Sequence, residues 1–270
     1  MEADLSSSCL LTIGKSCIEL QCNSSHLAER LRRQYQQFLS NDSAHLTVTV
    51  DWRNQSGIPA SASLPFTFVD GQPMITTDRV KGMISIEHRA ASIYLDVSNP
   101  LEVVDYFMRV VVALLLFQEG GLMVHAAGIV RNGKAYVFFG HSGSGKTTVA
   151  RLSSHDVVLN DDLIALLPEE QTWRVYATPF SNPTQVSPTC QNAPLVGLYR
   201  LNQASQVWIE SLSTARGLAE LISSVPVISA DPTRSRLLMQ RCYQLLTTAP
   251  CYNLYFLPDA SFWQVVEDAN

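Results

Sequence analysis

Gly140-His141-Ser142-Gly143-Ser144-Gly145-Lys146-Thr147 is the stretch that decides the fold of this chain. It matches every fixed position of the pattern G-x-x-x-x-G-K-[ST], and Thr148 follows it directly. The apolar run Ala135–Phe139 before it is typical of a buried strand, and Thr148–Leu152 after it can open a helix. A strand, a glycine-rich turn and a helix start direct unpaired backbone N–H groups at one point. The stretch therefore predicts a nucleotide phosphate site at residues 140–148.

Two adjacent carboxylates follow the loop. Asp161 and Asp162 end the run Asp156–Asp162, which predicts a strand that finishes in two carboxylates. A phosphate-binding loop works with Mg²⁺, to which Thr147 offers a hydroxyl and a strand-end carboxylate the next group. Neighbouring carboxylates repel each other unless a cation lies between them. We therefore expect Thr147, Asp161 and Asp162 to hold Mg²⁺, with one aspartate serving as a base; a turn with a helix cap is the alternative.

A tight hairpin comes before the loop. Asn132-Gly133 separates two apolar runs, and this dipeptide strongly favours a two-residue β-hairpin. In the antiparallel pairing that follows, His125 lies beside the strand that enters Gly140. We expect His125 to approach the terminal phosphate or to orient one of the aspartates; a packing role is the alternative. His141 and His155 are interpreted as local.

Composition excludes several classes of protein. The chain has 270 residues, of which 46% are hydrophobic and 16% charged, which is typical of a folded globular protein. The net charge is −5 and there is no dense run of Lys or Arg, so neither nucleic acid nor an anionic membrane is an expected partner. No lysine follows Lys146. A cation reaching the phosphates from the C-terminal part must therefore be an arginine, and the candidates are Arg151, Arg216, Arg234 and Arg236.

The cysteines and the N-terminus indicate a cytoplasmic protein. None of the six cysteines forms a C-x-x-C pair, so neither zinc nor a redox dithiol is indicated. Glu2 and Asp4 stand where a secretory signal carries basic residues. The most apolar run, Val110–Phe117, is too short to span a bilayer and predicts part of a buried helix.

Turn residues divide the chain at Asn99-Pro100. Residues 1–99 contain short strand-like runs and one helical stretch, His26–Leu39, but no motif for catalysis. They predict a small mixed α/β domain that packs or docks a substrate. Residues 100–270 start with a long apolar helix, carry the loop and continue through strands and helices. They predict a larger α/β domain that binds nucleotide.

Four features together resemble the HPr kinase/phosphorylase family. They are Val124-His125-Ala126-Ala127-Gly128, the short hairpin, the loop Gly140–Thr147 and Asn160-Asp161-Asp162. The resemblance covers residues 101–270, and it implies a phosphate-loop kinase domain of the HPr kinase or phosphoenolpyruvate carboxykinase type. Thr178-Pro179-Phe180 and Ala249–Leu254 are similar to a divergent branch that is associated with peptide modification.

The resemblance implies an ATP- and Mg²⁺-dependent serine kinase whose acceptor is a peptide or small protein. Lys146 would grip the β- and γ-phosphates, and Thr147 would hold the metal. Asp161 would take the proton of the acceptor serine. Asp162 would bind metal and pair with His125. The order of the two aspartates, ATP against GTP, and a homo-oligomeric state stay open.

The chain also departs from that family. Its loop ends Lys146-Thr147-Thr148 rather than Lys-Ser-Glu, and Ala215–Leu218 only echoes the family's Arg-Gly-Leu-Gly segment. HPr is therefore not the expected substrate, and the reverse phosphorylase activity is not expected either. Two other functions stay open: a kinase for a small molecule such as free serine, and a nucleotide-binding regulatory module without transfer activity.

Overall fold

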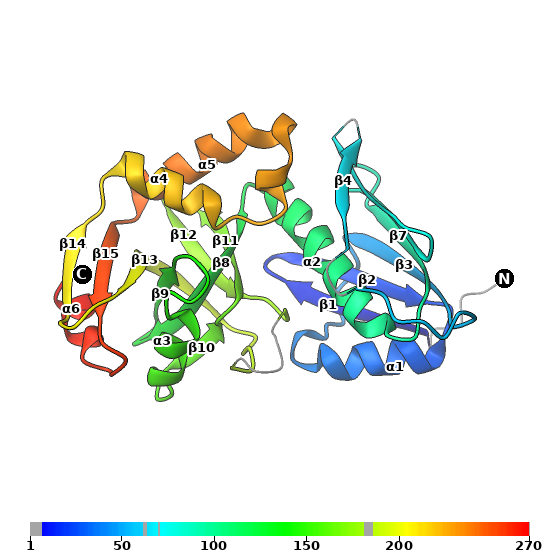
Figure 1. Cartoon of the computed structure of the whole chain (residues 1–270), viewed down its shortest axis with the longest axis horizontal. Coiled ribbons are helices and arrows are strands. Elements are labelled where there is room, and N and C mark those ends of the chain that lie inside the picture. Colours follow the sequence, from blue (N-terminus) through cyan, green and yellow to red (C-terminus); the bar gives the residue numbers. More distant parts are fainter. Residues whose placement is uncertain (1–6, 62–63, 70, 181–185, 270) are drawn as a thin grey trace. The chain divides into compact units, whose positions relative to one another are not determined.

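The computed structural model describes residues 7–61, 64–69, 71–180 and 186–269. Contacts between residues divide the chain into unit 1 (Met1–Leu115) and unit 2 (Leu116–Asn270). Each unit combines helices with a mixed sheet, so the mixed α/β class predicted from the sequence is confirmed (Figure 1). The division falls inside a helix, after Leu115, whereas the sequence places the domain boundary at Asn99-Pro100.

Unit 1 is built on a sheet of seven strands among the described residues, in the order β1-β2-β3-β7-β6-β5-β4. The β2–β3 and β3–β7 pairs are parallel and the other pairs are antiparallel. The strands are β1 (Ser8–Ile13), β2 (Ser16–Cys22), β3 (Leu46–Arg53), β4 (Phe66–Val69), β5 (Gln72–Thr76), β6 (Val80–Ser85) and β7 (Ala90–Asp96). The helices are α1 (Ser25–Gln34), the 3-10 turn η2 (Gln36–Phe38) and α2 (Pro100–Gln118).

Helix α2 groups with unit 1 because it packs on that sheet. Phe107 is fully buried, and a Cβ added to Gly82 of β6 would lie only 2.9 Å from its ring. The helix ends at Gln118: Gly120 has a left-handed φ of 90°, and the Gly121 N–H donates to the Leu116 carbonyl at 2.8 Å. In the described ranges no helix is both long and apolar enough to cross a membrane.

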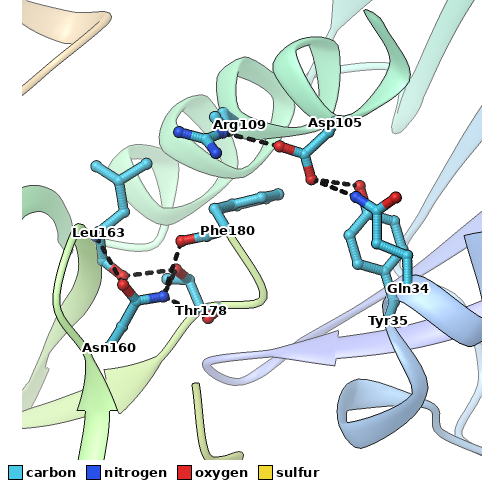
Figure 2. Close-up of polar contacts among 8 residues, drawn as sticks. All are labelled: Gln34, Tyr35, Asp105, Arg109, Asn160, Leu163, Thr178 and Phe180. Atoms are coloured by element: carbon cyan, nitrogen blue, oxygen red, sulfur yellow. Dashed lines mark hydrogen bonds and ion pairs between the residues drawn. The ribbon is translucent and has the colours of Figure 1, made fainter. Parts of the chain in front are cut away.

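A partly buried polar cluster joins the end of α1 to α2 (Figure 2). The Asp105 carboxylate accepts hydrogen bonds from the Tyr35 hydroxyl and the Gln34 amide, both at 2.9 Å, and from Arg109 Nε at 3.0 Å. Burial raises the pKa of Asp105, although the Arg109 guanidinium acts in the opposite direction. The paired charge lets a carboxylate sit between two helices without an unsatisfied oxygen.

Unit 2 contains a sheet of eight described strands, with the order β10-β8-β11-β12-β13-β15-β14 and with β9 paired to both β8 and β13. The strands are β8 (Leu122–Arg131), β9 (Lys134–Phe139), β10 (Val157–Asn160), β11 (Leu163–Glu169), β12 (Thr172–Ala177), β13 (Asn192–Gln203), β14 (Trp208–Ser211) and β15 (Cys251–Phe256). The helices are α3 (Lys146–Leu152), α4 (Thr214–Ser223), η3 (Ile228–Ala230), η4 (Pro232–Arg234), α5 (Ser235–Thr248) and α6 (Phe262–Asp268). Figure 1 shows α4 and α5 together at the top of this unit, and α3 and α6 at the bottom.

The core of unit 2 fixes the strand that leads into the glycine-rich loop. Phe138 of β9 stacks on Tyr199 of β13 with ring centroids 5.3 Å apart, and it meets Phe262 and Trp263 of α6 edge to face. Trp263 also donates from its indole N–H to the Ser153 hydroxyl at 3.0 Å, at the end of α3. Helix α6 therefore contacts both β9 and the end of α3. The two elements that flank the loop are held by packing against the same helix.

Candidate functional site

The glycine-rich loop leaves β9 after Phe139 and enters α3 at Lys146, as the motif predicts. Lys146 is 7% exposed, and its ammonium donates to the carbonyls of Gly140 at 2.9 Å and of His141 at 3.2 Å. Burial lowers the pKa of Lys146, while the carboxylates of Asp162 and Asp161 raise it. The lysine thus lies over the loop, within electrostatic range of both aspartates. Ser142 and Thr148 occupy the loop and the first turn of α3, as predicted.

Three glycines of the loop, Gly140, Gly143 and Gly145, have positive φ, and the surroundings of Gly143 and Gly145 differ. Gly145 has φ of 111°, and a Cβ there would come within 2.5 Å of the Phe256 ring at the end of β15. Gly143 has φ of 79° but open space around it. The Gln203 amide, at the end of β13, donates to the Gly143 carbonyl at 2.8 Å. The loop is therefore held from the β13–β15 side by one hydrogen bond and one close packing contact.

The hairpin before the loop forms as predicted. Asn132 and Gly133 have φ of 53° and 74°, the signs that a type I′ turn needs. Strands β8 and β9 pair antiparallel from Arg131 with Lys134 to Ala126 with Phe139. The next residues on the two strands are His125 and Gly140, so the backbone of His125 lies near Gly140, the first residue of the loop.

The two aspartates follow the end of β10, as the sequence predicts, and a further strand, β11, begins directly after them. Strands β10 and β11 both pair antiparallel with β8, and the register shifts by one residue between Val158 and Asn160. Asp161 and Asp162 lie between the two strands, and the Asp162 carbonyl accepts from the Ala126 N–H at 3.0 Å. Irregularities of this kind often turn side chains toward an active site. The sequence prediction did not include β11, although Leu163–Leu167 is a short apolar run of the kind that is typical of a buried strand.

Asn160 holds this turn from inside the protein (Figure 2). It is fully buried, and its side-chain oxygen accepts from the backbone N–H groups of Asp162 at 2.7 Å and Leu163 at 3.1 Å. Its amide donates to the carbonyls of Thr178 at 2.9 Å and Phe180 at 2.8 Å. The sequence prediction used Asn160 only as part of a motif. Its role as a support could have been inferred because an asparagine directly before a turn commonly bonds the backbone two residues on.

Asp161 carries the clearest chemical signal in the site. It is 1% exposed, and neither carboxylate oxygen receives a hydrogen bond of good geometry in the part of the chain that the structure describes, although the Thr147 hydroxyl and the Val186 N–H lie near. Burial raises the pKa of Asp161, although the Thr147 hydroxyl and the Val186 backbone N–H act to lower it. The carboxylate therefore lies near Thr147, in agreement with the expectation that the two share a ligand.

The residues around Asp161 fit a hard cation and a phosphate. The Ser144 hydroxyl in the loop is likewise buried without a partner among the described residues. No cluster of three or more His, Cys, Asp or Glu side chains that could hold a metal occurs in the described ranges. Mg²⁺ does not need one, because it commonly takes one or two carboxylates and completes its shell with water and phosphate oxygens. A hydroxyl, two nearby carboxylates and a loop with a buried lysine meet that requirement.

His125 and Asp162 form the second polar contact of the site. His125 Nε2 lies 3.2 Å from Asp162 Oδ1, and the His125 backbone N–H donates to the Ser224 carbonyl at 2.7 Å. The imidazole is 42% exposed, whereas the Asp162 side chain is 11% exposed. The pairing that the resemblance implies is thus present, and the ring has access to solvent.

The arginines distribute differently from the sequence expectation. Arg234 pairs with the fully buried Asp231, while Arg151, Arg216 and Arg236 are exposed on helices. Sequence reasoning missed Arg200, which pairs in register with Phe139, the last residue before the loop. Arg200 Nε lies 2.9 Å from Glu220 of α4. A charged residue inside the apolar run Leu195–Leu201 was the signal for it.

Comparison with known proteins adds a family to this geometry. The family model of the SynChlorMet cassette protein ScmC matches residues 96–269. The chain belongs to the ScmC family. That match runs from the end of β7 through α6 and includes the loop, His125 and both aspartates. No curated protein matches the chain.

Solved structures include a distant likeness to this ScmC-family chain. The Hpr(Ser) kinase/phosphatase from Coxiella burnetii matches with 10% sequence identity and a TM-score of 0.31. The match covers 54% of the present chain and 95% of the other.

Proposed function

We propose that this ScmC-family chain is an ATP- and Mg²⁺-dependent kinase that transfers the γ-phosphate to a serine hydroxyl of a peptide or small protein. The observation that carries the proposal is the buried carboxylate of Asp161, whose oxygens receive no hydrogen bond of good geometry in the described ranges although the Thr147 hydroxyl lies near. An ionised group left without partners in a protein interior is costly, so a ligand that satisfies it is expected.

Each residue has a task in this proposal. Lys146 binds the β- and γ-phosphate oxygens through its ammonium. Thr147 and Asp162 would hold Mg²⁺, which when bound neutralises charge on the β- and γ-phosphate oxygens. His125 donates from Nε2 to Asp162 Oδ1 and so fixes the orientation of that carboxylate.

Asp161 is assigned the role of general base. Its oxygens are free to accept the proton of the serine hydroxyl as that oxygen attacks the γ-phosphorus. Burial raises the pKa of Asp161, which makes it a stronger base than a solvated aspartate. A serine peptide as the acceptor rests on the resemblance to HPr kinases and on the peptide-modification branch that Thr178-Pro179-Phe180 resembles.

The test is transfer of label from γ-labelled ATP, with Mg²⁺, to a panel of serine peptides, their alanine counterparts and free serine. Labelled serine peptides and unlabelled alanine counterparts would support the proposal. Label on free serine alone would favour a small-molecule kinase. Tight ATP binding without any labelled acceptor would favour a regulatory module. Lys146→Ala should abolish both binding and transfer, whereas Lys134→Ala, at the exposed first residue of β9, should change neither.

A further inference from the structure

The strands on the two sides of the glycine-rich loop in the sheet of unit 2 carry different residues. Strand β9 lies between β8 and β13. On the β8 side are His125 and the two aspartates between β10 and β11. On the other side β13, β15 and β14 follow one another. Strands β13 and β9 are parallel, as are β13 and β15, so their carboxyl ends meet at the edge where the loop begins.

A nucleotide on this loop would have a fixed direction. The loop lysine and the metal belong to the β- and γ-phosphates. The γ-phosphate therefore points toward the aspartates, and the α-phosphate and nucleoside point away from them. With β9 in the middle of the order, that direction leads toward β13, β15 and β14.

The side chains at that end touch the loop. Gln203, the last residue of β13, donates to the Gly143 carbonyl at 2.8 Å. Phe256, the last residue of β15, lies where a Cβ on Gly145 would meet it at 2.5 Å. The backbone N–H of Ala204 donates to the Phe256 carbonyl at 3.1 Å and closes this corner. The turn from β13 to β14 thus begins directly beside the loop.

A flat aromatic pair stands next to this corner. Trp208, the first residue of β14, pairs in register with Tyr255 of β15. Their rings are stacked with centroids 4.0 Å apart and an angle of 6° between planes. The Trp208 indole N–H donates to Glu210 at 3.2 Å, which fixes the ring from the side.

This pair is not part of the core. Val207 and Ile209, on either side of Trp208, pack against the buried aromatic cluster around Phe138, and so do the buried Leu254 and Phe256. Because side chains alternate along a strand, Trp208 and Tyr255 point to the other face. Trp208 is 38% exposed. Core packing therefore does not account for a tryptophan at this position.

We propose that Trp208, backed by Tyr255, is the stacking platform for the base of the bound nucleotide; this deepens the proposed function and rests on it. A base that stacks on the open face of the indole extends a stack whose orientation is already fixed, so little conformational freedom is lost. Stacking of one base on an aromatic side chain corresponds to an affinity change on the order of 10- to 100-fold. Purine nucleotides have the larger ring and gain more than pyrimidine nucleotides.

The experiment compares two ligands that differ only in having a nucleoside. Binding of ATP and of inorganic tripolyphosphate, each with Mg²⁺, is measured by calorimetry for the full chain and three variants. Trp208→Ala is expected to weaken ATP binding on the order of 10- to 100-fold and to leave tripolyphosphate binding unchanged. Trp208→Phe, which keeps a smaller ring, should lie between. Tyr243→Ala, which removes another exposed aromatic side chain, on α5, is the matched control and should change neither affinity.

Each outcome has one meaning. If Trp208→Ala binds ATP as tightly as the unaltered chain does, the stacking platform is wrong and the kinase proposal stands. The same holds if Trp208→Ala loses affinity for ATP and for tripolyphosphate equally while Trp208→Phe keeps its affinity for both. If the unaltered chain binds neither ligand, both proposals fail. Tripolyphosphate binding by Trp208→Ala also reports that its loop is folded, so a selective loss of ATP affinity cannot come from misfolding.

Discussion

His125 Nε2 lies 3.2 Å from Asp162 Oδ1, across the point where the strand formed by β10 and β11 is interrupted beside β8. The contact joins a hairpin strand to the turn that carries both aspartates. It depends on the Asn132-Gly133 turn, which sets the register of β8, and on the register shift after Val158. A small change at either place would separate the two side chains.

A double-mutant cycle tests whether this pair acts as a unit. His125→Ala and Asp162→Asn are each expected to lower kcat of peptide phosphorylation, and the double variant should fall short of the sum by a coupling of about 0.5–3 kcal/mol. Folding should survive His125→Ala, because the ring is half-exposed and the Ser224 contact uses the backbone. The measurement is kcat at saturating ATP. Strict additivity would mean that the two residues act independently.

Asp161→Asn should separate catalysis from binding. The amide cannot accept the serine proton, so kcat should fall on the order of 10²-fold or more, while nucleotide affinity changes little. Asp78→Asn, at an exposed position in unit 1, is the matched control and should leave kcat unchanged. Unchanged turnover in Asp161→Asn would remove this residue from the role of base and shift attention to Asp162.

The same substitution should stabilise the ligand-free protein, with a defined pH dependence. Because burial raises the pKa of Asp161, its ionised form costs stability above that pKa, and the cost disappears as pH falls through it. Asp161→Asn should therefore raise the free energy of unfolding at pH 7 by on the order of 1 kcal/mol. The difference between the two proteins should shrink toward pH 4, near the unfolded aspartate pKa of about 3.9. Urea denaturation at both pH values measures it, and a difference that grows as pH falls would contradict the assignment.

The sequence predicted the local parts of the site because each has a short-range cause. The loop and the Asn132-Gly133 hairpin follow from glycines and from apolar runs near them. The helical stretch predicted in residues 1–99 is also present as α1, where the Ser24 hydroxyl accepts from the Leu27 N–H at 3.3 Å.

Features that depend on distant partners were missed. Strand β5 (Gln72–Thr76), which contains Pro73, was not predicted from the sequence. Helix α6 is only seven residues long, and its pattern gains meaning only through Phe138 and Tyr136, which lie far away in the chain. Arg200 became a candidate only when the strand pairing put it beside Phe139, and Trp208 only when it was found stacked on Tyr255, next to the end of β15. Neither residue belongs to a motif that local spacing could reveal.

Asn160 should contribute strongly to the free energy of unfolding, although it has no role in the proposed reaction. Asn160→Ala removes the acceptor for two backbone N–H groups and the donor for two carbonyls, all in a buried site. Leaving a buried group unsatisfied costs about 1–3 kcal/mol, so a loss of roughly 2–4 kcal/mol is expected. Asn202→Ala, a half-exposed asparagine on β13, is a control and should cost less. Equal losses in the two variants, measured by urea denaturation, would mean that the buried bonds contribute little.

Gly143 and Gly145 of the loop allow steric and conformational effects to be separated. Gly143→Ala adds a methyl group in open space, so its penalty is that of the left-handed backbone alone, about 1–2 kcal/mol. Gly145→Ala adds the same kind of penalty and a collision with the Phe256 ring. It should therefore weaken tripolyphosphate binding well beyond the effect of Gly143→Ala.

A second change tests that cause directly. Phe256→Leu removes the part of the ring that the new methyl group would meet, and it should restore part of the binding lost in Gly145→Ala while having a smaller effect in Gly143→Ala. The restoration will be incomplete, because the left-handed φ of 111° at position 145 remains unfavourable for alanine. Equal effects of Phe256→Leu on both glycine variants would show that contact with β15 does not shape the loop, and that the backbone angle alone requires glycine there.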